Sequence, residues 1–102
     1  MSLTREQYLL TLIQEECAEV AHRASKCLRF GIDEAREGHK PNIKLLAEEF
    51  LDLLTVISML DSDLDGKFGD QFTDDESIDY ENAKIDKVEK YFKYSQELGT
   101  AE

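Results

Sequence analysis

LIQEECAEVAHRASKCLR, residues 12–29, has the hydrophobic period of a long amphipathic helix. At about 100° per residue, Leu12, Ile13 and Val20 fall on one broad apolar face. Glu16 projects into the middle of that face, and Glu19 lies at its edge. A carboxylate on an apolar face normally has a cation, a hydrogen-bond donor or a metal ion beside it, because burying it alone is costly. The stretch therefore predicts a helix that carries acidic side chains toward the core.

A second stretch repeats this feature. AEEFLDLLTVISML, residues 47–60, is the most hydrophobic part of the chain, yet Glu49 and Asp52 project onto its apolar face. Each helix thus carries an acidic pair at i and i+3, the spacing of surface neighbours on a helix. Packing the two faces together would gather four carboxylates, and cations must then neutralise them. Such an all-oxygen set suits a hard ion, Mg²⁺ or Mn²⁺.

The remaining sequence predicts a third amphipathic helix and no β-strand. Thr4 and Gln7 form a capping-box pattern, and Asn42 is expected to cap the second helix. We predict one all-α domain, residues 1–102. The wide apolar faces predict a helical bundle completed by a second copy of the chain. The expected helices span residues 4–29, 42–61 and 78–98.

Composition limits the possible partners. The chain has 102 residues and a net charge of −11, which argues against a general nucleic-acid or anionic-membrane surface. The two cysteines, Cys17 and Cys27, project in different directions from the first helix, so free thiols and a cytoplasmic location are expected. There is no signal-peptide pattern and no apolar run long enough to span a membrane.

The acidic spacing resembles a known signature. Glu15-Glu16-x-x-Glu19, followed by Glu49-x-x-Asp52, resembles that of the MazG-like superfamily of all-α nucleoside triphosphate pyrophosphohydrolases. The wider text ECAEVAHRASKCLRFG and LAEEFLDLLTVISML is similar to the small, phage-type members. The resemblance implies a helical homodimer or homotetramer. It also implies Mg²⁺-dependent hydrolysis of ribo- or deoxyribonucleoside triphosphates to monophosphate and pyrophosphate, in nucleotide-pool control or sanitation.

The resemblance also implies roles for individual residues. Glu16, Glu19, Glu49 and Asp52 match the family's Mg²⁺ ligands. Glu15 matches an additional acid that holds a second ion or orients water, and Glu15 or a ligand such as Glu16 would take a proton from that water. The candidates for holding the phosphates are basic residues near the end of the first helix and on the third: Lys26, Arg29, Lys84 and Lys87.

Other interpretations stay open. A Glu16–Arg23 salt bridge would explain one inward carboxylate without a metal, and Glu15 also fits an ordinary solvated face. A non-enzymatic helical interaction module would turn its acids outward toward a basic partner. Asp61, Asp63 and Asp65 resemble the first half of a calcium-binding EF-hand loop, but the twelfth position is Phe72 where a glutamate is needed. We therefore expect an acidic solvated loop at residues 61–77.

Overall fold

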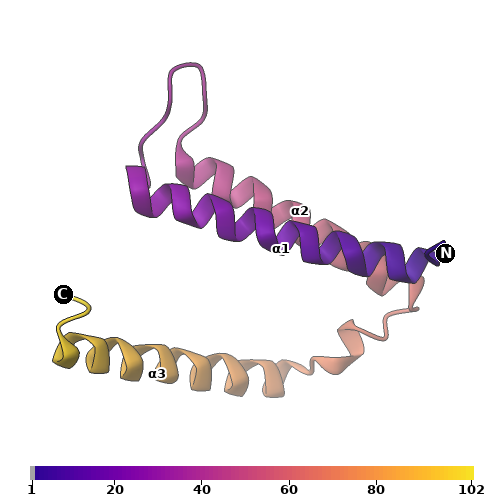
Figure 1. The fold of residues 1–102 in the computed structure, drawn as a ribbon. Helices are drawn as coiled ribbons and strands as arrows, with labels where there is room; N and C mark the ends of the chain where they lie inside the picture. The colour runs from indigo at the N-terminus through magenta and orange to yellow at the C-terminus, as the bar shows by residue number, and fades with distance from the viewer. Residues whose placement is uncertain (1) are drawn as a thin grey trace. The chain divides into compact units, whose positions relative to one another are not determined.

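The computed structural model describes residues 2–102 and confirms an all-α fold with three main helices (Figure 1). The chain divides into two compact units, the first ending at Lys67 and the second beginning at Phe68. The first contains α1 and α2, and the second contains a short 3-10 helix, η1, and α3. Their bounds are α1 Arg5–Phe30, α2 Asn42–Asp63, η1 Gly69–Gln71 and α3 Asp74–Leu98.

The start of α1 confirms the predicted capping box. The Thr4 hydroxyl accepts a hydrogen bond from the Gln7 amide at 3.1 Å, and the Gln7 side-chain oxygen accepts one from the Thr4 amide at 3.0 Å. The helix continues for 26 residues. Gly31 ends it with a φ of 106°, a conformation that glycine adopts without strain.

The start of α2 differs from the prediction. Pro41 occupies the N-cap position, and Asn42 is the first helical residue, 6% exposed. The Asn42 side-chain amide donates to the Gly31 carbonyl at 2.9 Å and to the Glu34 carboxylate at 2.8 Å. The prediction that Asn42 is the N-cap was therefore wrong. Its side chain bonds to the α1–α2 connection, and no side chain caps the start of α2.

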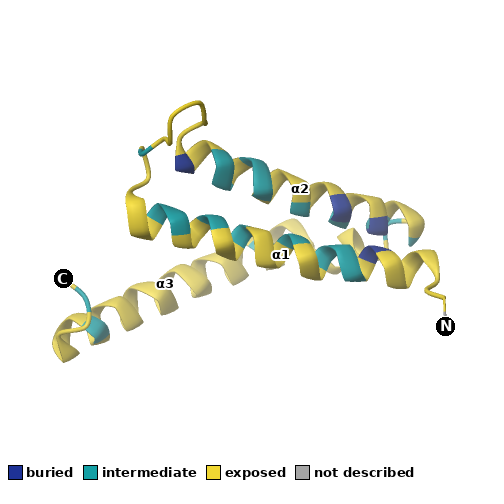
Figure 2. Ribbon diagram, turned by 45° about the horizontal axis from the view of Figure 1, so that its top comes forward, coloured by how far each residue is buried: buried dark blue, intermediate teal, exposed yellow. Residues whose placement is uncertain are grey.

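The core of the first unit lies between α1 and α2, which run antiparallel (Figures 1 and 2). Leu9 is 1% exposed and packs with Val56 and Leu60. Leu12, Ile13 and Leu64 pack around these three and are partly buried. The buried and partly buried residues of the two helices follow their facing sides, as the 3.6-residue period requires (Figure 2).

The acidic segment after α2 is shorter than predicted. Helix α2 continues to Asp63, whose carboxylate pairs with Arg5 Nε at 2.5 Å. Helix α3 begins at Asp74, where residue 78 was predicted, because the Thr73 hydroxyl accepts from the Glu76 amide at 3.3 Å and acidic residues follow in the first turn. Part of the expected acidic solvated loop is therefore helical, and Asp63 forms an ion pair with Arg5.

Much of the apolar surface stays exposed. No residue of α3 is buried, although this helix carries Ile85, Val88 and Phe92. Few residues in the whole described chain are buried, and such mostly exposed amphipathic helices favour an oligomer. Within residues 2–102, no helix combines the length and apolar character needed to cross a lipid bilayer.

Candidate metal centre and adjoining basic pocket

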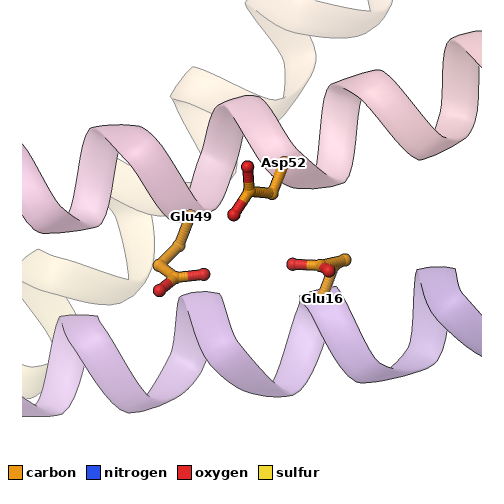
Figure 3. A group of neighbouring side chains, drawn as sticks. All are labelled: Glu16, Glu49 and Asp52. Carbon is orange, nitrogen blue, oxygen red and sulfur yellow. The ribbon is translucent and has the colours of Figure 1, made fainter.

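Three carboxylates from two helices meet in the first unit. Glu16 projects from α1 toward α2, and Glu49 and Asp52 project from α2 to meet it (Figure 3). One oxygen from each residue lies within 4.8 Å of the other two. Glu16 and Glu49 are partly buried, while Asp52 is exposed. We call this group the acidic cluster.

The pKa of Glu16 is raised above its ordinary value. The main cause of this shift is the partial burial of Glu16, which disfavours the charged form of its carboxyl group. The carboxylates of Asp52 and Glu49 raise it further, with smaller effects from Glu19 and Glu15. Carboxylates that repel one another at such short range fit a divalent cation, whose charge would offset the repulsion and whose preferred ligands are oxygens. The acidic cluster could therefore hold a metal ion.

Arg23 lies beside the acidic cluster on α1. Its Nε is 3.9 Å from Oε1 of Glu49, so the ion pair forms with Glu49 and differs from the Glu16–Arg23 pair considered from the sequence. The Nε atom is buried and has no hydrogen-bond acceptor among the residues that the structure describes. One arginine therefore compensates only part of the negative charge, and the acidic cluster is not a closed salt-bridge network.

A pocket of about 450 Å³ lies between the end of α1 and the start of α2, and Arg23 is one of its lining residues. Its wall combines basic side chains with the ring of Phe30 and the aliphatic side chain of Leu45. The basic residues that line it are Arg23, Lys26, Arg36, His39 and Lys40. We call this the basic pocket.

The fold holds the basic pocket in shape through the α1–α2 connection. The Asn42 side chain joins Gly31 to Glu34, and the Ile43 amide donates to the Ile32 carbonyl at 2.9 Å. Farther along, the His39 amide donates to the Arg36 carbonyl at 2.8 Å. These hydrogen bonds hold the connection at both ends, and its basic residues Arg36, His39 and Lys40 line the pocket.

Lys40 is also held in place. Its ammonium group donates to Oε1 of Glu48 at 2.6 Å. This hydrogen bond is the main cause that lowers the pKa of Glu48, with the charges of Lys40 and Lys44 adding to it against a smaller opposing effect of burial. The basic residue at the pocket rim is thus anchored to α2.

The predicted site residues fall into two groups. Glu16, Glu49 and Asp52 come together as described, and Lys26 lines the basic pocket. Glu19 is exposed and outside the acidic cluster, although its charge reaches Glu16. The others are exposed: Glu15 on α1, Arg29 over the Phe30 ring at 5.0 Å, and Lys84 and Lys87 on α3 in the second unit.

Sequence reasoning missed the basic residues of the connection, Arg36, His39 and Lys40. The sequence did contain a signal, which is local clustering of basic residues. These three lie within one stretch of five positions, in a chain where 23 acidic residues far outnumber 12 basic ones. Helical periodicity could not predict where these side chains point, because they lie in the connection after the first helix. Only the path of the connection brings them beside Lys26.

Comparison with protein-family models, curated proteins and solved structures gives no match to this chain. The structure itself shows a small all-α protein of three main helices with an acidic group that could hold a metal ion. The resemblance to MazG-like pyrophosphohydrolases stays a prediction from the acidic spacing and the wider sequence of the first two helices.

Proposed function

We propose that this protein hydrolyses nucleoside triphosphates, ribo or deoxy, to the monophosphate and pyrophosphate in a Mg²⁺-dependent reaction. The observation that carries the proposal is the acidic cluster between α1 and α2, where Glu16, Glu49 and Asp52 place oxygens within 4.8 Å of one another. Carboxylates this close repel one another, and a divalent cation bound between them would offset that repulsion.

The adjoining basic pocket supports the same proposal. A triphosphate carries about four negative charges, and the acidic cluster alone would repel it. Lys26 and Arg23 lie on α1 within three turns of Glu16 and line the pocket. Arg23 links the two parts of the site, because its Nε lies 3.9 Å from Oε1 of Glu49 in the acidic cluster. One part of the site would thus receive a cation while the other attracts phosphate oxygens.

The roles of the residues follow from their chemistry. Glu16, Glu49 and Asp52 would hold Mg²⁺, with Glu19 as a further ligand. Bound there, the ion would polarise phosphoryl oxygens and lower the pKa of water. Glu15 is exposed on α1 next to Glu16, and we assign it the proton that leaves the attacking water. Arg23 and Lys26 would orient the phosphate chain, with Arg29, Lys84 and Lys87 as further candidates.

The proposed enzyme is a homodimer or homotetramer acting in the cytoplasm in nucleotide-pool control or sanitation. The exposed apolar faces of the helices support the oligomer. Cys17 and Cys27 are free thiols, which supports a reducing compartment.

The test is pyrophosphate release from the standard ribo- and deoxyribonucleoside triphosphates, with Mg²⁺ and with EDTA. We expect metal-dependent release, a matching monophosphate, and no release above the EDTA level for Glu16→Gln. Glu89→Gln, an exposed carboxylate on α3, is the matched control and should keep full activity.

Full metal-dependent turnover by Glu16→Gln would exclude the assigned centre. Absence of release from every nucleotide, with Mn²⁺ tried as well, would exclude the proposed activity toward standard nucleotides. A structural metal site in a helical interaction module would then be the better interpretation.

A further inference from the structure

The basic pocket stands out against the charge of the whole chain. Net charge is −11, with 12 Lys and Arg residues against 23 Asp and Glu. Four of those 12 bases line one pocket of about 450 Å³, where Glu34 is the one acidic residue among the described lining residues. Lys40 and Arg23 also pair with Glu48 and Glu49, which lie outside the lining. A cleft lined by one sign of charge concentrates ligands of the opposite sign. An anion is therefore the ligand class that this pocket fits.

One atom of the lining residue Arg23 lacks a hydrogen-bond partner in the described part of the chain. Arg23 Nε is buried, and no hydrogen-bond acceptor for it exists within residues 2–102, since Glu49 is 3.9 Å away. Buried donors are normally satisfied, and each exception calls for an explanation. The positive charge of Arg23 is therefore only partly compensated by Glu49, and the same residue lines the basic pocket.

The number and type of basic side chains limit which class of anion the pocket can bind. Arg23 and Arg36 present planar guanidinium groups that bind two phosphate oxygens at once, and Lys26 and Lys40 add point charges. A single carboxylate would leave most of these donors unmatched. A group with several linked phosphates offers enough charge and enough oxygens for donors from both α1 and the α1–α2 connection.

The pocket is largely formed before any ligand arrives. Asn42 fastens the connection to Gly31 and Glu34, and Lys40 is held by Glu48 at 2.6 Å. The Lys26 ammonium lies 5.5 Å from the centre of the Phe30 ring, which restrains it at the rim. A preorganised set of donors loses little side-chain freedom on binding, so affinity does not depend on a metal ion to order the site.

We infer that the basic pocket binds a di- or triphosphate group directly through Arg23, Lys26, Arg36 and Lys40, without a metal ion. Two sources share this chemistry, free pyrophosphate and the phosphate tail of a nucleotide. The inference deepens the proposed function, since the pocket would hold the end of the substrate that leaves as pyrophosphate. Binding of the free anion does not require that function to hold.

The experiment is isothermal titration of the whole protein in EDTA with pyrophosphate, ATP and AMP. We expect pyrophosphate to bind, ATP to bind comparably, and AMP to bind at least about tenfold more weakly. Affinity should fall as KCl is raised, because salt screens the charges. Binding of pyrophosphate without ATP would assign the free anion as the ligand and still supports the pocket.

Variants locate the binding. Arg36 is exposed on the α1–α2 connection. Arg36→Ala should weaken pyrophosphate binding about tenfold or more, and Arg36→Glu should abolish this binding. Lys93→Ala, an exposed cation on α3 that does not line the pocket, should bind like the wild type. Circular dichroism of each variant checks that the helices are kept.

Three results would overturn the inference: pyrophosphate binding only when Mg²⁺ is present, unchanged binding in Arg36→Glu, or AMP binding tighter than pyrophosphate. None of these depends on hydrolysis. A protein that binds pyrophosphate in EDTA but never hydrolyses a triphosphate would refute the proposed function and leave the anion pocket in place.

Discussion

Arg23 and Glu49 face each other from α1 and α2, with Nε 3.9 Å from Oε1. Each belongs to a different part of the site, since Glu49 is in the acidic cluster and Arg23 lines the basic pocket. The pair is partly buried on both sides, with side chains 31% and 21% exposed. The cation candidate site and the anion candidate site therefore share one electrostatic contact.

That contact gives the first prediction. Arg23→Met removes a positive charge beside a metal ligand, so Mn²⁺ titrated alone should bind several-fold more tightly, because the two cations no longer repel each other. Pyrophosphate in EDTA should bind more weakly to the same protein. Calorimetry with each probe measures both effects. Weaker Mn²⁺ binding in Arg23→Met, compared with a Lys93→Met control, would contradict this reading of the contact.

The raised pKa of Glu16 predicts how stability depends on pH. The folded state holds the Glu16 proton at pH values where the unfolded chain has lost it, above the ordinary value of 4.5. In EDTA, the free energy of unfolding should therefore fall as pH rises from about 4.5 through the raised pKa. Urea unfolding across this range measures the slope.

Glu16→Gln should remove that part of the slope, while Glu89→Gln should keep it. In the wild type at neutral pH, Mg²⁺ should raise the unfolding midpoint, because a ligand that binds only the folded state stabilises it. An identical pH slope in Glu16→Gln and wild type would show that Glu16 is not the titrating group.

Asn42→Ala tests the hydrogen bonds by which Asn42 holds the α1–α2 connection in place. The substitution removes donors to Gly31 and Glu34 from a residue that is 6% exposed. Losing buried hydrogen bonds of this kind costs about 1–3 kcal/mol. We expect that loss in urea unfolding, together with weaker pyrophosphate binding because the pocket wall is released. Asn82→Ala, exposed on α3, should change neither quantity.

Leu9→Ala tests the core of the first unit. Leu9 is 1% exposed and packs against Val56 and Leu60, so truncation should cost about 2–5 kcal/mol. Leu10→Ala is the matched control, because Leu10 is 43% exposed on the same helix. Thermal unfolding that fails to separate the two variants would argue against the packing of α1 on α2.

The small core predicts a concentration-dependent stability. If the exposed apolar faces pack against a second copy, dilution should lower the unfolding temperature, because association stabilises the folded state by mass action. Differential scanning calorimetry over a hundredfold range of protein concentration measures this. A constant unfolding temperature, with a monomeric mass in sedimentation equilibrium, would contradict the homo-oligomer.

Much of the fold was predictable from local sequence. Hydrophobic period placed three helices, and Thr4 with Gln7 marked the start of α1 to within a residue. The start of α3 was missed because Thr73 and its acidic neighbours were read as loop, although a hydroxyl followed by acids is an ordinary helix start. Asn42 was misread for a related reason, since its residue type suits a cap and only the fold directs its amide elsewhere.

By itself, the sequence determined which residues could meet on each helix face, because the 3.6-residue period is a local property. For that reason Glu16, Glu49 and Asp52 share the facing sides of α1 and α2, although Asp52 stays exposed. Tertiary structure alone decided that Arg23 pairs with Glu49 and that Arg36, His39 and Lys40 close a pocket beside Lys26. These relationships join residues of separate elements through a connection without periodicity, so they exist only once α1 and α2 have packed and Asn42 has fastened the chain between them.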